Sequence, residues 1–122
     1  MIFLEGRKVL ITGGSRGIGR ATAILFAKAG CDLAINFINQ KEAAEKAREE
    51  IDKIGRECLV FKADISQNND VNSMVKEVID KWGRIDILVN NAGIWTYGEM
   101  GKMSEKTWAE TMKINMDGVF YT

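Results

Sequence analysis

The sequence has 122 residues and no histidine, and this absence excludes several kinds of active site. Imidazole is the usual base, proton shuttle and metal ligand near neutral pH. A serine-histidine triad and a zinc site with histidine ligands are therefore ruled out within these residues. The two cysteines, Cys31 and Cys58, stand far apart in the sequence, so neither a zinc motif nor a disulfide framework fits. We expect buried, reduced thiols and no bound metal.

Long apolar runs and an excess of charge are also missing. No stretch approaches the roughly 18–20 apolar residues that cross a bilayer, and the first residues lack the layout of a signal peptide. Lysines and arginines together number 17, and aspartates and glutamates together also number 17, so the formal net charge is zero. Such a chain has no global positive field to hold nucleic acid or anionic lipid. We expect a cytoplasmic protein without nucleic-acid or membrane partners.

What remains is an ordinary globular composition, with 46% apolar and 28% charged residues. The length fits one domain of the usual size, about 100–150 residues. Four short apolar runs predict strands at residues 9–11, 32–36, 58–61 and 85–89. Three helical patterns lie between these strands: one begins at Ile18, and the other two cover residues 40–54 and 66–82. The helix that begins at Ile18 is so apolar that we predict it to pack between layers.

The alternation of strands and helices is typical of an α/β fold, a doubly wound parallel sheet with helices on both faces. We predict a Rossmann-like sheet with the strand order 3-2-1-4. Residues 91–103 form a predicted loop, and a further helix is expected from Glu105 onward with Ser104 as its N-cap. Its apolar pattern continues to Thr122 without a stop signal. We therefore expect one domain over residues 1–122, cut inside an element.

A glycine turn follows the first predicted strand and opens the first predicted helix. Bare backbone and a helix N-terminus together form a phosphate-binding cradle. A P-loop would need lysine and then serine or threonine after Gly19, but Arg20 and Ala21 stand there. The pattern Gly-x-Gly-x-x-Gly is absent as well; the sequence has Thr12-Gly13-x-x-x-Gly17-x-Gly19.

This pattern, together with Asn90-Asn91-Ala92-Gly93 after the fourth predicted strand, resembles the short-chain dehydrogenase/reductase family. Within that family the sequence is most similar to the 3-oxoacyl-carrier-protein reductases. The resemblance covers all 122 residues, although members of the family are about twice as long. It implies that these residues are the N-terminal, cofactor-binding half of a longer oxidoreductase.

The resemblance also implies roles for single residues. The turn would hold the cofactor's pyrophosphate, Ser15 and Arg16 would contact the adenosine ribose, and Asp64 and Ile65 would flank the adenine. The backbone after the fourth strand would run alongside the nicotinamide ribose at Asn91, Ala92 and Gly93. Asn90 would tie strands together. The alternative for Asp64 is a carboxylate facing the N-terminus of the third helix. The turn residues are Gly13, Gly14, Ser15, Arg16, Gly17, Ile18 and Gly19.

The choice of cofactor can be argued from charge. An NAD site normally places an acid at the end of the second strand, where it accepts from the ribose 2′-hydroxyl. Asn36 holds that position, so nothing there repels a 2′-phosphate, and Arg16 can attract one. We predict NADP (NADPH) as the preferred cofactor, with NAD as the alternative. Arg16 could otherwise be a solvated turn residue.

Most of the catalytic residues that the family would supply are missing. The resemblance implies a tyrosine, a lysine four residues later, a serine and an asparagine, and only the asparagine is found, as Asn115. Its alternative role is a polar helix residue satisfied by a backbone carbonyl. Tyr97 is followed four residues later by Gly101, so no Tyr-x-x-x-Lys exists. Trp95 and Tyr97 either line a substrate entrance or pack.

Two classes of function follow. The first is an NADPH-dependent carbonyl reductase of fatty acid biosynthesis, acting on a 3-oxoacyl thioester or similar ketone, with a sugar or alcohol dehydrogenase as the variant. The second is a dinucleotide-binding module without turnover. The resemblance implies a small-molecule substrate with a carbonyl or secondary alcohol, and a homo-oligomer. Residues 87–89 form a predicted apolar edge strand, so we expect dimers or aggregates of these residues alone.

Overall fold

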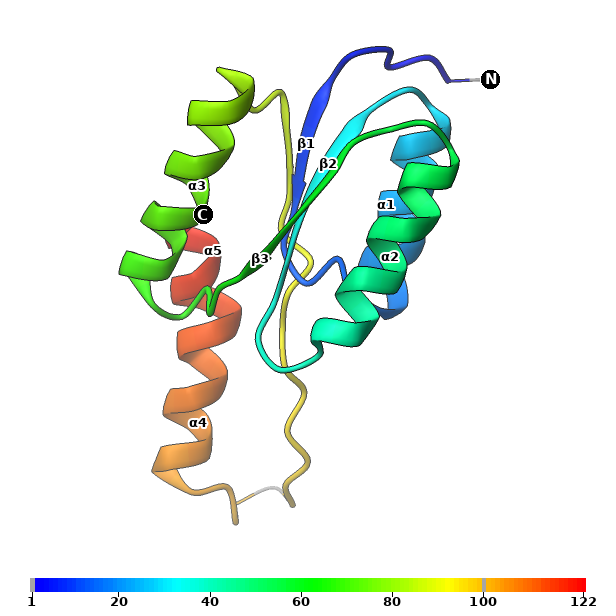
Figure 1. The fold of residues 1–122 in the computed structure, drawn as a ribbon. Helices are drawn as coiled ribbons and strands as arrows, with labels where there is room; N and C mark the ends of the chain where they lie inside the picture. The colour runs from blue at the N-terminus through cyan, green and yellow to red at the C-terminus, as the bar shows by residue number, and fades with distance from the viewer. Residues whose placement is uncertain (1, 100) are drawn as a thin grey trace.

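The protein is a parallel sheet covered on both faces by helices, in a computed structural model that describes residues 2–99 and 101–122 (Figure 1). The strands are β1 (Lys8–Ile11), β2 (Asp32–Phe37), β3 (Cys58–Lys62) and β4 (Ile87–Val89). Their order is β3-β2-β1-β4, and each neighbouring pair is parallel. The predicted fold class and strand order are confirmed.

Helices α1 (Gly17–Lys28) and α2 (Lys41–Lys53) cover one face of the sheet, and α3 (Asn68–Trp82) covers the other (Figure 1). A continuous segment follows of α4 (Glu105–Met112), the π-helical turn η1 (Lys113–Asp117) and α5 (Gly118–Tyr121), and α5 packs beside α3 (Figure 1). Ser104 caps α4 as predicted, since its side chain accepts from the Thr107 N–H at 3.1 Å. None of the described helices is long and apolar enough to span a membrane.

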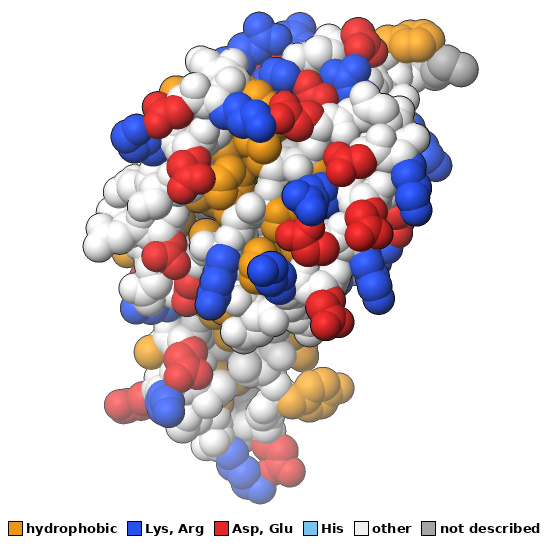
Figure 2. All heavy atoms as spheres, viewed as in Figure 1, with side chains coloured by type: hydrophobic (Ala, Val, Ile, Leu, Met, Phe, Trp, Pro, Cys, Tyr) orange, Lys and Arg blue, Asp and Glu red, His pale blue; other side chains and the backbone are white. Residues whose placement is uncertain are grey.

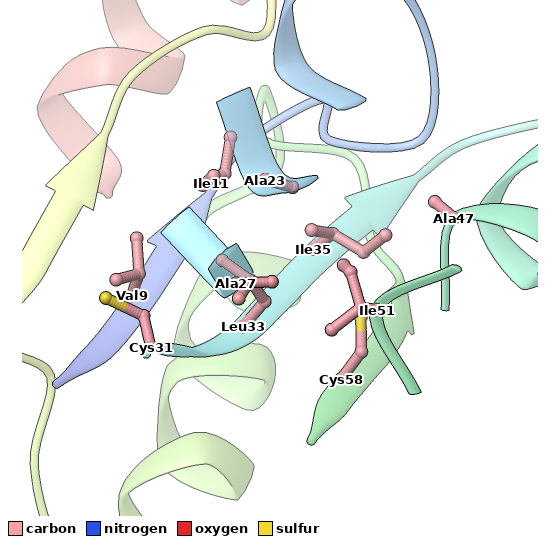
Figure 3. Close-up of a cluster of buried hydrophobic side chains, with 10 residues drawn as sticks. All are labelled: Val9, Ile11, Ala23, Ala27, Cys31, Leu33, Ile35, Ala47, Ile51 and Cys58. Atoms are coloured by element: carbon pink, nitrogen blue, oxygen red, sulfur yellow. The ribbon is translucent and has the colours of Figure 1, made fainter. Parts of the chain in front are cut away.

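The core consists of two apolar layers separated by the sheet. β2 lies in the middle of the sheet and is buried on both sides, as is typical of parallel strands covered by helices. Figure 3 shows the layer between the sheet and α1 and α2. It contains both cysteines, which are free, and burial raises the pKa of Cys58 to about 12. The cysteines are buried thiols, as predicted.

Helix α1 differs from its prediction. It packs on the sheet through the small residues Ala23 and Ala27, whereas Leu25 is 66% exposed and Ile18 is 80% exposed. The expectation that α1 is packed between layers was therefore wrong, because the structure provides only one layer for it to cover. Strand β4 and helix α3 are also shorter at their starts than the sequence predicted, and the residues before α3 form its capping turn.

The two edges of the sheet are protected differently. At the β3 edge, Figure 2 shows hydrophobic side chains flanked by charged ones. The hollow along that edge is lined on its sides by Glu45, Arg48, Glu77 and Lys81. Charged side chains beside an edge strand oppose pairing with another chain. The β4 edge carries Leu88, which is 40% exposed, within an all-apolar strand.

Candidate cofactor-binding site

A cleft of about 440 Å³ lies at the carboxyl ends of the strands. The order of the strands reverses beside β1, and in doubly wound sheets ligands bind at that place. Three segments that are far apart in the sequence meet there: the glycine turn, the connection from β2 to α2, and the loop after β4. The lining residues are Gly13, Ser15, Arg16, Gly17, Ile18, Asn36, Phe37, Ile38, Asn39, Gln40, Ile65, Asn91, Ala92, Gly93, Ile94 and Ile114.

The glycines of the turn serve two different purposes. Gly17 has a φ of +54°, and a Cβ built on it meets nothing within 4 Å. Gly14 and Gly19 instead face the protein, where a Cβ would lie 2.5 Å from Ile35 Cγ2 and 2.4 Å from the Gly13 carbonyl oxygen, respectively. Only Gly17 therefore leaves open space for a ligand, while Gly14 and Gly19 let the turn pack tightly behind the cleft.

The start of α1 is suited to an anion. Its N-cap residue, Arg16, has extended backbone, and the first helical bond runs from the Arg20 N–H to the Arg16 carbonyl. The N–H groups of the first turn consequently have no partner within the helix. The first turn of α1 contains no acidic residue that would compete for them. Such a helix N-terminus attracts phosphate through its free N–H groups and its dipole.

A clamp joins the ends of β1 and β4 behind this turn. Thr12 is buried, and its Oγ1 accepts from the N–H groups of Asn91 and Ala92 at 3.1 and 3.0 Å. The Asn91 Nδ2 donates to the carbonyl oxygens of Thr12 and Gly13 at 2.9 and 3.1 Å. The predicted tie between strands is thus made by Asn91 and not by the exposed Asn90, because Asn91 is the residue whose side chain reaches the turn. Sequence reasoning gave Thr12 no role, although it stands directly before Gly13.

Asn36 holds the turn from its other side. It is 2% exposed, its Oδ1 accepts from the Gly13 N–H at 2.7 Å, and its Nδ2 donates to the Ala63 carbonyl at 2.8 Å. Both polar ends of this side chain are therefore engaged within the protein. The structure places Asn36 on the wall of the cleft, where it acts as a brace between β2, the turn and the end of β3. Its role in binding the cofactor stays a prediction.

The two residues predicted to flank the adenine are placed differently. Ile65 lines the cleft. Asp64 does not line it; its Oδ1 accepts from the Ser66 N–H at 2.9 Å, and its own N–H donates to Asp70 at 2.9 Å. These bonds form the turn that leads into α3. The structure thus places Asp64 in the turn ahead of α3, on the side of its alternative role, with its carboxylate bonded to Ser66 before the first helical residue.

Asn115 lies in η1 and holds the loop that follows β4. Its Oδ1 accepts from the Ile94 N–H and its Nδ2 donates to the Ile94 carbonyl, each at 2.9 Å. A Cβ on Gly93 would come within 3.2 Å of the Asn115 Oδ1, so any larger residue there would force the Asn115 side chain to shift. Single turns of π-helix occur frequently at functional sites. A catalytic role for Asn115 stays a prediction.

Two aromatic residues of the loop after β4 do not pack against the described residues. Trp95 is 87% exposed and Tyr97 is 98% exposed, next to the cleft-lining residues Gly93 and Ile94. Packing within the described residues, one of the two roles considered for them, is excluded. An entrance for a substrate remains the prediction for this segment.

Comparisons with known proteins agree with this geometry. The chain is 39% identical over 114 residues to 3-oxoacyl-acyl-carrier-protein reductase FabG of Staphylococcus epidermidis, an alignment that covers 93% of this chain and 47% of that protein. The Staphylococcus aureus reductase is equally similar, with 46% of its length covered. The chain thus spans about half the length of the curated relatives it matches.

Solved structures show the same fold. A short chain dehydrogenase from Burkholderia cenocepacia in complex with NADP superposes with a TM-score of 0.93 at 36% identity, over 97% of this chain and 48% of that one. A short-chain type dehydrogenase/reductase from Mycobacterium marinum gives a TM-score of 0.93 at 33% identity, over 98% of this chain and 48% of that one. Residues 7–122 match the short chain dehydrogenase family, and the chain belongs to that family.

Proposed function

We propose that these residues are the dinucleotide-binding half of an NADPH-dependent oxidoreductase that reduces a ketone, with a 3-oxoacyl thioester as the first substrate. The observation that carries this proposal is the open, acid-free start of α1 facing the cleft, where Gly17 leaves room for a ligand. The free N–H groups would bind the pyrophosphate. The reductases from Staphylococcus support the substrate class, and the sugar or alcohol dehydrogenase remains the variant.

The preference for NADPH rests on charge. Among the described residues, no carboxylate lines the cleft, while Arg16 does. Asn36 stands where an NAD site normally has an acid, and it is neutral. Both ends of its amide are bonded within the protein, so its side chain does not take the place of that acid toward the adenosine ribose. A guanidinium can bind a phosphate through two hydrogen bonds. The NADP complex of the Burkholderia protein supports the same choice.

In this proposal the 122 residues bind and orient the dinucleotide, but they do not include the tyrosine that gives the proton in this family. When bound, the nicotinamide would supply the hydride. Asn115 fixes the backbone of Ile94 beside the cleft and so shapes the side where a substrate would enter. No Tyr-x-x-x-Lys occurs in the 122 residues. This favours the second candidate, a binding module without turnover, for the 122 residues taken alone, and the reductase for a longer protein containing them.

Calorimetric titration with NADPH and NADH tests the proposal. We expect NADPH to bind more tightly, and the variant Arg16→Ala to raise the Kd for NADPH by about tenfold, the value of one charge-assisted contact, with little effect on NADH. Lys28→Ala, at the far end of α1, is the matched control. With a 3-oxoacyl thioester present, these residues alone should not oxidise NADPH. A folded sample that gives no heat with either cofactor would contradict the assignment.

A further inference from the structure

An apolar groove of about 450 Å³ lies between α1 and the N-terminal segment, and it shares no lining residue with the cofactor cleft. We call it the α1 groove. Its polar lining residues are Thr22 and Lys28, and no acid among the described residues lines it. The other lining residues are all apolar: Ile2, Leu4, Leu25, Phe26 and Ala29. The α1 groove is therefore a place for an apolar ligand, distinct from the dinucleotide cleft.

Helix α1 has a second apolar side that the fold leaves open. It packs on the sheet through Ala23 and Ala27, yet Leu25 is largely exposed. Ile2, which faces it across the α1 groove, is also largely exposed. This second side is the reason why the sequence of α1 predicted packing between two layers. Removing such side chains from water is favourable, so the α1 groove can stabilise a bound apolar chain.

The N-terminal wall of the α1 groove is held in place by backbone hydrogen bonds. The Leu4 N–H donates to the Ala29 carbonyl at 2.8 Å, and the Gly6 N–H donates to the Gly30 carbonyl at 2.9 Å. The segment is thereby fixed to the carboxyl end of α1, and the α1 groove exists before any ligand binds. A preformed, mostly apolar hollow with a few polar groups is the usual form of a small-molecule site.

Lys28 gives the α1 groove a single positive charge. It lies in the last turn of α1, and among residues 2–99 and 101–122 it forms no ion pair. Glu5, the acid of the adjoining N-terminal segment, pairs instead with Arg56 at 2.7 Å. A ligand with an apolar chain and one negative group would therefore match both the apolar walls and the unpaired cation.

We propose that the α1 groove binds a free medium-chain fatty carboxylate, with its alkyl chain along Leu4, Leu25 and Phe26 and its carboxylate at Lys28. The site goes beyond the proposed function, because it lies outside the cleft and needs no dinucleotide. A carboxylate matches one lysine in charge, whereas a phosphate monoester would bring about −1.5 to −2 charges to the same cation. A cationic amphiphile would be repelled by Lys28.

Two amphiphiles with the same alkyl chain and opposite charge test the proposal. Dodecanoate and dodecyltrimethylammonium are titrated by calorimetry below their micelle concentrations. We expect dodecanoate to bind at least about fivefold more tightly, and Lys28→Ala to weaken it by about threefold, the value of one exposed ion pair. Lys28→Arg should restore the affinity, because it keeps the charge. Leu25→Glu should weaken dodecanoate by at least about tenfold, since it removes apolar contact and adds a like charge.

Lys53→Ala is the matched control, since Lys53 is an exposed lysine in the last turn of α2. It should leave both affinities unchanged. Circular dichroism checks that Leu25→Glu is folded, and saturating dodecanoate should change the Kd for NADPH by less than about twofold.

Equal affinity of the original protein for the two amphiphiles would overturn the proposal, as would a folded Leu25→Glu variant that binds dodecanoate normally. Competition between dodecanoate and NADPH would overturn it too, because the ligand would then lie in the cleft. Dodecanoate binding that weakens as the protein concentration rises would show that a second copy fills the α1 groove instead. If NADPH binds and dodecanoate does not, only this site fails. If dodecanoate binds as expected and NADPH does not, the site stands and the proposed function fails.

Discussion

Gly17 and Gly19 stand two positions apart, yet their environments predict opposite effects for the same substitution. In Gly17→Ala the new Cβ has open space, so we expect a loss of only about 1 kcal/mol in unfolding free energy, from the left-handed backbone. That Cβ would project toward the cleft and weaken dinucleotide binding. In Gly19→Ala it would collide with the Gly13 carbonyl oxygen, and we expect a loss of about 3 kcal/mol.

Urea unfolding measures the first quantity and NADPH titration the second. A Gly17→Ala variant that binds NADPH normally would show that the open space is not the phosphate site. A Gly19→Ala variant as stable as the original would show that the backbone around Gly13 can shift. Sequence alone predicted that these glycines form one turn, but it could not separate their purposes. The separation depends on Asn91, which comes close to Gly19 only when β4 lies beside β1.

At the scale of elements, apolar periodicity predicted the strands and helices because parallel strands and amphipathic helices carry strong local signals. Their ends were less predictable where side chains from elsewhere determine them. The π-helical turn η1 is an example, since it carries Asn115 toward the backbone of Ile94, which belongs to a separate loop. The same limit applies to Asn36 and Asp64, whose partners are backbone groups that the fold supplies.

The amino ends of β1, β2 and β3 are joined through one carboxylate, and this arrangement predicts a dependence on pH. Asp32 contacts the Lys8 Nζ, the Arg56 guanidinium and the Glu57 N–H. Burial alone would raise its pKa, but these hydrogen bonds prevail and hold the pKa of Asp32 below its ordinary value. Its contribution to stability is therefore complete above the unfolded-state pKa, about 3.9, and is lost as the pH falls through the folded-state pKa.

Asp32→Asn should lower the unfolding free energy at pH 7 by about 2 kcal/mol, because it leaves Lys8 and Arg56 without their shared partner. The difference between variant and original should shrink as the pH falls below about 4, since the original then loses the charge as well. Urea unfolding at pH 7, 5 and 3 measures this. The matched control is Asp52→Asn, which changes an exposed acid on α2. A constant difference across that range would contradict the linkage.

At the scale of the whole molecule, the described residues leave apolar surface uncovered at β4 and on the helices from α4 to α5. β4 pairs only with β1 among these residues, and Trp108, Met116 and Phe120 on the helices from α4 to α5 are 60%, 59% and 85% exposed. Large exposed apolar patches and unprotected edge strands promote association. The β3 edge has charged neighbours and the β4 edge has an apolar strand, so association should begin at β4.

We therefore predict that the 122-residue chain associates with increasing concentration, and that Leu88→Lys shifts it toward the monomer. A lysine in an edge strand opposes pairing because the new strand would have to bury or crowd its charge. Leu25→Lys on α1 is the matched control, since Leu25 is also exposed but lies away from the sheet edge. Size-exclusion chromatography over a range of concentrations measures the effect. If Leu25→Lys rather than Leu88→Lys produces the monomer, the apolar groove beside α1, lined by Leu4 and Phe26, is the contact surface instead of β4.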